Sequence, residues 1–225
     1  VDAATARFPW EMLSSRVAGA TGAPASLGWR SQGALVRRLR VDKFRRDPAD
    51  SVCERVLMVG MSNLESFRGQ PLARLPGVQA EMDAVQTALG GSSLQLTPLA
   101  DPDANDAAKA LLAGPWKVVH LSGHGINEVD KASNERTTGM LISGTVVLGP
   151  TEMQAMDSVP ELVFVNGCHL GKIAGPGVTP QGVFAASVAQ QLISDGVRCV
   201  VAAGWAVDDA GAAAFAKAFY EMLLH

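Results

Sequence analysis

Cysteine is scarce in this chain, and its three residues, Cys53, Cys168 and Cys199, are widely spaced. An odd, dispersed set argues against a disulfide framework and favours a reducing compartment, so we expect a cytoplasmic protein. Charged residues make up only 18% of the chain and leave a net charge of −3, which gives no electrostatic reason to expect direct binding of nucleic acid. No apolar run approaches the roughly 18 residues that a membrane span needs, and no signal-peptide pattern is present.

Hydrophobic residues, in contrast, are plentiful. They make up 48% of the 225 residues, which is enough for the core of one α/β domain. Short β-branched runs alternate along the chain with segments of helical periodicity. This alternation predicts a three-layer α/β/α sandwich, in which helices cover both faces of a mostly parallel central sheet. We expect the core to occupy residues 51–225 and residues 1–50 to form a less regular N-terminal annex.

Local patterns predict the individual elements. Two central strands are expected at Arg55–Gly60 and Gly196–Ala203, and helices at 78–89, 104–112, 182–192 and 208–224. The last helix is expected to bury one face, made of Ala212, Phe215, Phe219 and Leu223. The polar stretch 125–139 is predicted to be a long loop, and 140–148 a hairpin that turns at Ser143-Gly144.

Two further strand-like runs end abruptly in glycine and a reactive side chain. Val118-Val-His-Leu-Ser-Gly-His-Gly125 carries His124 at its end, and Leu162-Val-Phe-Val-Asn-Gly-Cys-His-Leu-Gly171 carries Cys168. The working crevice of an open α/β sheet lies beyond the carboxyl ends of its strands, so both side chains should reach one edge. A thiol needs a neighbouring base or cation to become a thiolate near neutral pH. The pair therefore predicts the Cys/His dyad of a cysteine hydrolase.

The two segments resemble motifs of the CHAT group of caspase-like peptidases, relatives of caspases, metacaspases and separases. His-Leu-Ser-Gly-His-Gly is similar to the group's His-box and Asn-Gly-Cys-His-Leu-Gly to its Cys-box, and the 44 positions from His124 to Cys168 are close to the caspase spacing. Weaker similarities follow the family's order at Phe8-Pro-Trp-Glu11, Leu75-Pro-Gly-Val-Gln-Ala-Glu-Met-Asp83 and Gly204-Trp-Ala-Val-Asp-Asp-Ala210 with Phe219-Tyr220. The resemblance implies a caspase-like fold, His124 and Cys168 as catalytic pair, and no cofactor.

The remaining histidines and cysteines have less distinctive surroundings. His120 lies inside its strand and is expected to be buried with satisfied partners, and Cys199 is expected in the core. His169 should face away from the dyad, since neighbouring side chains on a strand point to opposite faces. A zinc site made of His120, His124, Cys168 and His169 is the competing interpretation. Four residues of strand span about 13 Å, however, and the glutamate of a helical zinc-protease motif is absent, so we expect no metal.

The resemblance also implies an oxyanion hole and a substrate pocket. The backbone N–H groups of Gly125 and Cys168 would stabilise the oxyanion. Asn166 stands where related peptidases that cut after basic residues often carry an acid, and Trp205 ends the next strand, so both should line the pocket. Asp208 and Asp209 either reach this pocket or cap the last helix. Because Asn166 is neutral, the sequence favours a pocket that does not require a basic residue before the scissile bond.

These features predict a cysteine endopeptidase that acts on a protein or peptide substrate. The resemblance implies activation by a partner or regulatory domain in bacterial signalling or immunity. The chain opens on Val1-Asp2-Ala3 and ends in an expected helix, so we expect it to be a fragment of a larger protein. A catalytically silent interaction module is the alternative, against which the intact dyad argues. A nucleotide-binding domain is disfavoured, because no glycine-rich phosphate loop follows the first strand.

Overall fold

The computed structural model describes residues 53–129, 136–167, 181–203 and 207–224, together with the two-residue strands β1 (Ser14–Ser15) and β2 (Ala25–Ser26). The expected annex, residues 1–50, otherwise lies outside the described residues. The division of the chain at residue 50 therefore stays a prediction.

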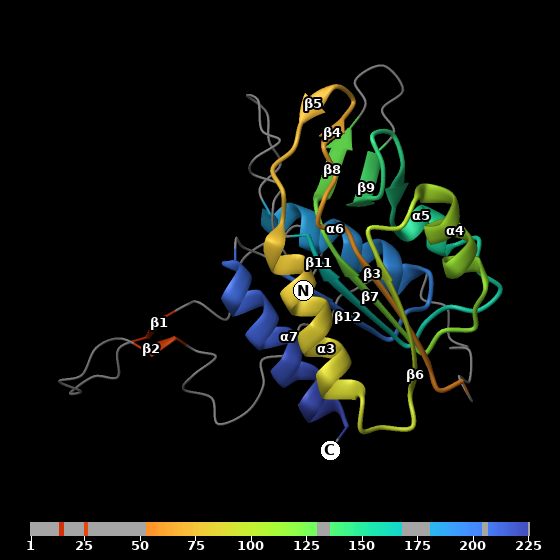
Figure 1. The fold of residues 1–225 in the computed structure, drawn as a ribbon, viewed down its shortest axis with the longest axis vertical. Helices are drawn as coiled ribbons and strands as arrows, with labels where there is room; N and C mark the ends of the chain where they lie inside the picture. The colour runs from red at the N-terminus through yellow and green to blue at the C-terminus, as the bar shows by residue number, and fades with distance from the viewer. Residues whose placement is uncertain are drawn as a thin grey trace.

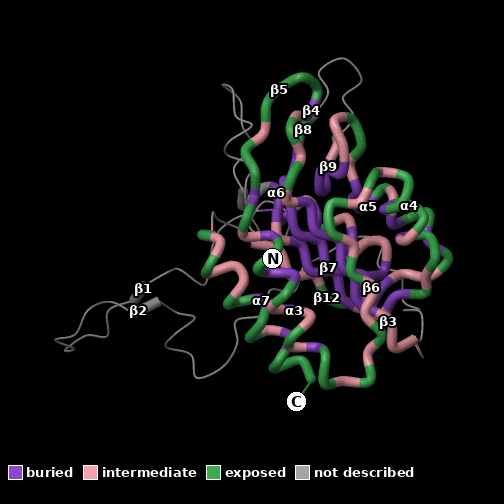
Figure 2. Tube along the Cα trace, viewed as in Figure 1, coloured by how far each residue is buried: buried purple, intermediate pink, exposed green. Residues whose placement is uncertain are grey.

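A five-stranded parallel sheet forms the centre of the molecule (Figure 1). Its strands lie in the order β12 (Cys199–Ala202), β11 (Leu162–Asn166), β7 (Val118–Ser122), β3 (Arg55–Gly60) and β6 (Gln95–Ala100). The three inner strands are almost wholly buried, as expected for parallel strands covered on both faces (Figure 2). The strands predicted around His124 and Cys168 are thus direct neighbours in the sheet.

Helices cover both faces of this sheet. One face packs on α3 (Pro76–Leu89) and α7 (Asp209–Leu223), and the other on α4 (Ala104–Leu112), α5 (Pro150–Met153) and α6 (Gln181–Ser194). Alternate residues of β3 show the division: Met58 faces α3 and α7, whereas Leu57 and Val59 face α4 and α6. The predicted three-layer α/β/α sandwich is confirmed.

Short antiparallel strands extend the sandwich beyond the carboxyl edge of the sheet. They are β4 (Ser66–Phe67) with β5 (Gln70–Pro71), and β8 (Gly125–Val129), β9 (Arg136–Leu141) and β10 (Val147–Leu148). The prediction of a loop over 125–139 was wrong, because β8 and β9 pair there. Asn127 and Thr138 are buried and bonded to each other across this pair, so polar composition concealed a strand. The predicted hairpin after residue 140 is confirmed, with Leu141 opposite Val147.

Two burial predictions were wrong. The last helix buries Ala216 and Tyr220, whereas Phe215 is 57% exposed and Leu223 is 49% exposed. Tyr220 faces the sheet, where its hydroxyl lies 3.1 Å from His120 Nδ1, and Phe215 and Phe219 contact Phe164 from the margin of the buried face. Cys199, expected in the core, is exposed, because it opens β12, which pairs only with β11 in the described part of the sheet.

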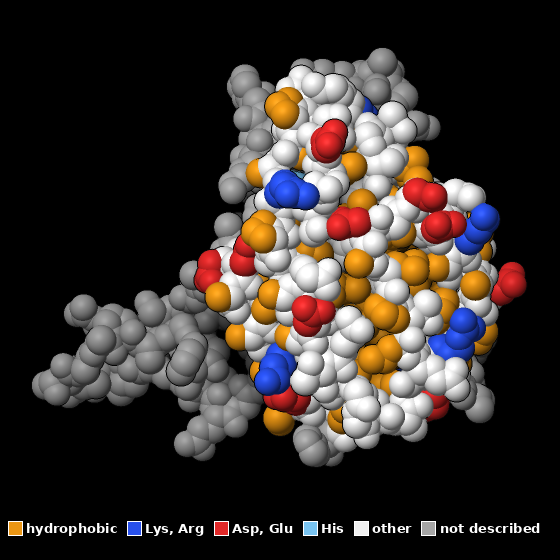
Figure 3. All heavy atoms as spheres, viewed as in Figure 1, with side chains coloured by type: hydrophobic (Ala, Val, Ile, Leu, Met, Phe, Trp, Pro, Cys, Tyr) orange, Lys and Arg blue, Asp and Glu red, His pale blue; other side chains and the backbone are white. Residues whose placement is uncertain are grey.

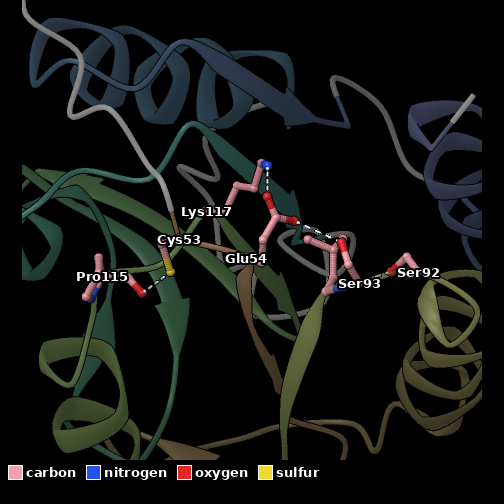
Figure 4. A network of polar contacts seen from close by, with 7 residues as sticks. Cys53, Glu54, Ser92, Ser93, Pro115 and Lys117 are labelled. Atoms are coloured by element: carbon pink, nitrogen blue, oxygen red, sulfur yellow. Dashed lines mark hydrogen bonds and ion pairs between the residues drawn. The ribbon is translucent and has the colours of Figure 1, made fainter.

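The amino edge of the sheet is tied together by polar contacts (Figure 4). Glu54, just before β3, accepts a hydrogen bond from Lys117 Nζ at 2.8 Å, just before β7, and one from Ser93 Oγ at 3.4 Å. Lys117 lowers the pKa of Glu54. Solvent screens an exposed pair of this kind, so its role is to join the strands at this edge. The candidate residues lie at the opposite edge.

The surface is mixed in character. On the face drawn in Figure 3, acidic and basic side chains are interspersed, and hydrophobic atoms show between them along the edge strand β6. Among the described residues, no helix is both long enough and apolar enough to span a membrane.

Gly77 allows α3 and α7 to approach closely at their N-terminal ends. A Cβ built on Gly77 would overlap the side chain of Asp209 on α7. Gly77→Ala should therefore destabilise the protein by about 1–3 kcal/mol in urea unfolding, although alanine is the better helix former. Gly91→Ala is the control, since a Cβ there meets nothing within 4 Å. Equal stability of the two variants would show that the contact is not tight.

Candidate active site

The two motifs meet because β7 and β11 are hydrogen-bonded neighbours in parallel. Their register places Ser122 opposite Asn166, the last residue of each strand. The N–H of Gly123 donates to the carbonyl oxygen of Asn166 at 3.0 Å and continues the pairing past the ends of both strands. The turn that carries His124 therefore lies beside the end of the strand that precedes Cys168.

Two glycines bring the motifs into van der Waals contact. A Cβ built on Gly125 would lie 3.0 Å from the carbonyl oxygen of Gly167, and one built on Gly167 would lie 3.2 Å from Gly125 Cα. The ring of Phe184 from α6 packs beneath both, since each added Cβ would also lie within 3.0 Å of it. The residue after His124 thus contacts the residue before Cys168. Cys168 itself lies outside the described residues.

His124 is buried, with an exposed fraction of 1%, and its Nε2 lies 2.7 Å from the carbonyl oxygen of Ala73. A carbonyl oxygen can only accept, so Nε2 carries the proton in this contact. In the neutral ring Nδ1 is then the nitrogen with the lone pair, which is the one that could take a proton from a thiol. Ala73 thus selects the tautomer of a candidate general base.

The segment that contains Ala73 is held at both ends. Ser62 donates to Asp101 through its backbone N–H and its hydroxyl, at 2.6 Å each. The N–H of Leu75 donates to the carbonyl oxygen of Ser62 at 2.8 Å and closes the segment into a loop. The carbonyl that orients His124 is therefore fixed by the ends of β3 and β6, where Ser62 and Asp101 lie.

A buried carboxylate, Glu81 on α3, connects the ends of the same two strands. It is 1% exposed and accepts hydrogen bonds from Ser122 Oγ at 2.7 Å and from Asn166 Nδ2 at 2.5 Å. His120 Nε2 lies 3.4 Å from its other oxygen, and His120 Nδ1 in turn contacts the Tyr220 hydroxyl. His120 is buried, as expected, but only its Nδ1 has a hydrogen-bond partner, because Nε2 makes an ion-pair contact with Glu81 at 3.4 Å and no hydrogen bond within the described residues.

These contacts keep Glu81 ionised. Burial alone would raise its pKa, but hydrogen bonds and charge from His120, together with the bonds from Ser122 and Asn166, lower the pKa below its ordinary value near 4.5. Burial, with the Glu81 charge, raises the pKa of Tyr220, so that residue remains a hydroxyl at neutral pH.

A small hollow lies between the N-terminal ends of α3 and α7, over the carboxyl edge of the sheet. Its empty space of about 270 Å³ includes its open mouth, and it is lined by Leu75, Gly77, Val78, Glu81, Ser122, Gly123, Asn166, Asp209 and Ala212. Gly123 precedes His124, and Asn166 lies two residues before Cys168. The hollow is therefore adjacent to both motifs.

Asp208 and Asp209 are neighbours in the sequence but differ in their surroundings. Asp208 caps α7, because its Oδ1 accepts a hydrogen bond from the N–H of Gly211 at 2.9 Å. Asp209, the first residue of α7, lines the hollow together with Asn166. Trp205, the third residue expected at this pocket, lies outside the described residues.

Sequence reasoning missed Glu81 and the Ala73 carbonyl. Glu81 stands one position before Met82 on the apolar face of α3, and a lone acid on such a face is a signal for a buried partner. No side-chain pattern can reveal a backbone carbonyl. The competing zinc site needs Cys168 and His169, both outside the described residues. His120 and His124 direct their Nε2 atoms to different partners, Glu81 and Ala73.

Ionised Glu81 should make stability depend on pH. Its folded pKa is lowered, so its contribution is present above its ordinary pKa and is lost as the pH falls through the lower folded value. In urea unfolding, Glu81→Gln should cost about 1–3 kcal/mol at pH 7 and progressively less below pH ~4. Glu221→Gln, which removes an exposed pair with Lys217, should change little at any pH. A Glu81→Gln deficit that does not shrink in acid would contradict this assignment.

Comparison with known proteins identifies the family to which the chain belongs. A search of the curated proteins finds no match. The family model described as CHAT domain matches residues 1–225, the whole chain. This domain is related to the caspase-like peptidases, which agrees with the parallel sheet and with the resemblance of both motifs. The chain therefore belongs to the CHAT domain family.

Proposed function

We propose that this CHAT domain is a cysteine endopeptidase that cleaves a protein substrate with Cys168 as nucleophile and His124 as base. The observation that carries the proposal is the contact between Gly125 and Gly167, which brings the two motifs together at one edge of the sheet. The orientation of His124 by Ala73 gives the imidazole the tautomer that a base requires.

The chemistry follows from these roles. His124 Nδ1 takes the thiol proton of Cys168, and the sulfur forms a bond to the scissile carbonyl carbon, whose π electrons move to oxygen. When the oxyanion collapses, the C–N bond breaks and the imidazolium protonates the leaving amine. Water, activated by the same imidazole, then hydrolyses the thioester. No cofactor enters these steps.

The oxyanion needs preorganised donors, for which we propose the backbone N–H groups of Gly125 and Cys168. Gly125 opens β8 and is opposite Met140 in β9, so its backbone is fixed by a strand pair. A side chain at this position would press on the carbonyl oxygen of Gly167. The glycine thus permits the close approach of the two motifs.

The same proposal extends to the substrate, to the activating partner and to the cellular setting of the domain. The domain would act in the bacterial cytoplasm, in signalling or immunity, and would be activated by a partner protein or regulatory domain. We propose that Asn166 and Trp205 line the substrate pocket, although Trp205 lies outside the described residues.

Removal of either dyad member should abolish cleavage. We expect Cys168→Ala and His124→Ala each to lower the rate about as far as the double variant, because residues that act as one unit lose their effect together. The measurement is mass spectrometry of new protein N-termini in host cells that express each variant. Cys199→Ala, an exposed cysteine on the edge strand, is the matched control and should retain activity.

One outcome of this experiment would contradict the proposed peptidase activity. A set of new N-termini that is the same for wild type and Cys168→Ala would mean that the domain does not cleave by this thiol. The fold would then serve as a silent interaction module.

A further inference from the structure

The carbonyl group that orients His124 belongs to a segment with little packing of its own. Ala73, whose oxygen lies 2.7 Å from His124 Nε2, is exposed, and so is Arg74. Both residues lie between β5 and α3, outside any helix or strand, and Leu75 is the first buried side chain after them. The direction of the Ala73 carbonyl therefore depends on the hydrogen bonds that its neighbours make.

Those hydrogen bonds lead back to two residues just beyond the end of β3. Nε of Arg74 donates to Oδ1 of Asn63 at 2.8 Å. The N–H of Leu75 donates to the carbonyl oxygen of Ser62, also at 2.8 Å. The two residues that follow Ala73 are thus bound to Asn63 and Ser62, whose position decides where the Ala73 carbonyl lies.

Asp101, directly after β6, holds both Ser62 and Asn63. Its Oδ1 accepts hydrogen bonds from the backbone N–H of Ser62 at 2.6 Å and from that of Asn63 at 3.0 Å, and its Oδ2 accepts one from the Ser62 hydroxyl at 2.6 Å. Hydrogen bonds to a carboxylate are stronger than those between neutral groups. One side chain on the neighbouring strand therefore anchors the base of the segment that carries Ala73.

The backbone of Asp101 has an unfavourable conformation. Its φ of 46° lies in the left-handed region, which few residues other than glycine adopt. Its N–H donates to the carbonyl oxygen of Gly60 at 2.8 Å, so the residue is still attached to the end of β3. Such a conformation persists only where the surrounding contacts determine it, and it is most frequent at functional sites. The three hydrogen bonds of the Asp101 carboxylate are contacts of this kind.

We propose that Asp101 is a positioning residue for His124. By holding Ser62 and Asn63 it fixes the Ala73 carbonyl, which keeps the imidazole proton on Nε2 and the lone pair on Nδ1. The consequence for cleavage rests on the proposed peptidase function, because it requires that His124 act as the base. The consequence for the imidazole proton does not, so the two can be tested separately.

Exchange of the His124 Nε2 proton with water tests this role without requiring catalysis. The proton is followed by NMR in protein that carries isotope-labelled histidine, and its signal is identified by its loss in His124→Ala. Asp101→Gly permits the same φ but removes the three acceptor contacts, so exchange should become about tenfold faster. Asn63→Ala, which removes the acceptor of Arg74, should accelerate exchange in the same direction.

Asp101→Asn is the conservative variant. Asparagine tolerates the left-handed region, and its single carbonyl oxygen can still accept both backbone N–H groups. The exchange rate should therefore stay close to that of the wild type. In the active enzyme, Asp101→Gly should lower kcat with little change in KM, because a displaced base impairs the chemical step more than substrate binding, and Asp101→Asn should restore kcat.

Asp103→Gly is the matched control. Asp103 is also an acid after β6, but it caps α4 by accepting a hydrogen bond from the N–H of Asp106, and glycine replaces a cap at little cost. Exchange at His124 should not change. A wild-type exchange rate in Asp101→Gly would overturn the inference, as would equal acceleration by Asp101→Asn or by Asp103→Gly. Absence of cleavage by the wild type would instead count against the dyad.

Discussion

The parallel pairing of β7 with β11 is the constraint on which the candidate site depends. Ser122 and Asn166 end their strands side by side, so the chain leaves both strands at the same edge of the sheet. Gly123, Gly125 and Gly167 then let the two outgoing segments lie in contact. A slip of β11 by one residue would turn each of its side chains to the opposite face of the sheet, so the packing on both faces helps to fix the meeting of the motifs.

Glu81 joins the three layers of the sandwich at this edge. It extends from α3 to both strand ends, and through His120 it is connected to Tyr220 on α7. Hydrogen bonds satisfy one Glu81 oxygen, and the other faces His120 Nε2 at 3.4 Å, so the donors and the charge of His120 together lower the pKa of Glu81 despite its burial. The same carboxylate therefore links α3 to the ends of both central strands and, through His120, to α7.

The sequence predicts the inner strands and the helices well, because apolar residues form short continuous runs in the strands and recur at helical spacing in the helices. It did not predict β6, since Pro98 interrupts the strand pattern. An edge strand tolerates proline, and among the described strands β6 pairs with β3 alone. It also misplaced the most buried face of α7, which Ala216 and Tyr220 occupy, with the Tyr220 hydroxyl beside His120. Side chains that act through long-range polar partners, such as Glu81, leave little trace in local patterns.

The most direct test of the account is the ionisation of Cys168 in the presence and absence of His124. Alkylation of each cysteine by iodoacetamide can be followed against pH by peptide mass spectrometry, with the exposed Cys199 as an internal reference. The account predicts that Cys168 reacts as a thiolate well below the pH of about 8.5 typical of a free thiol, and that His124→Ala moves its profile toward that value. The same Cys168 profile in both proteins would contradict the dyad.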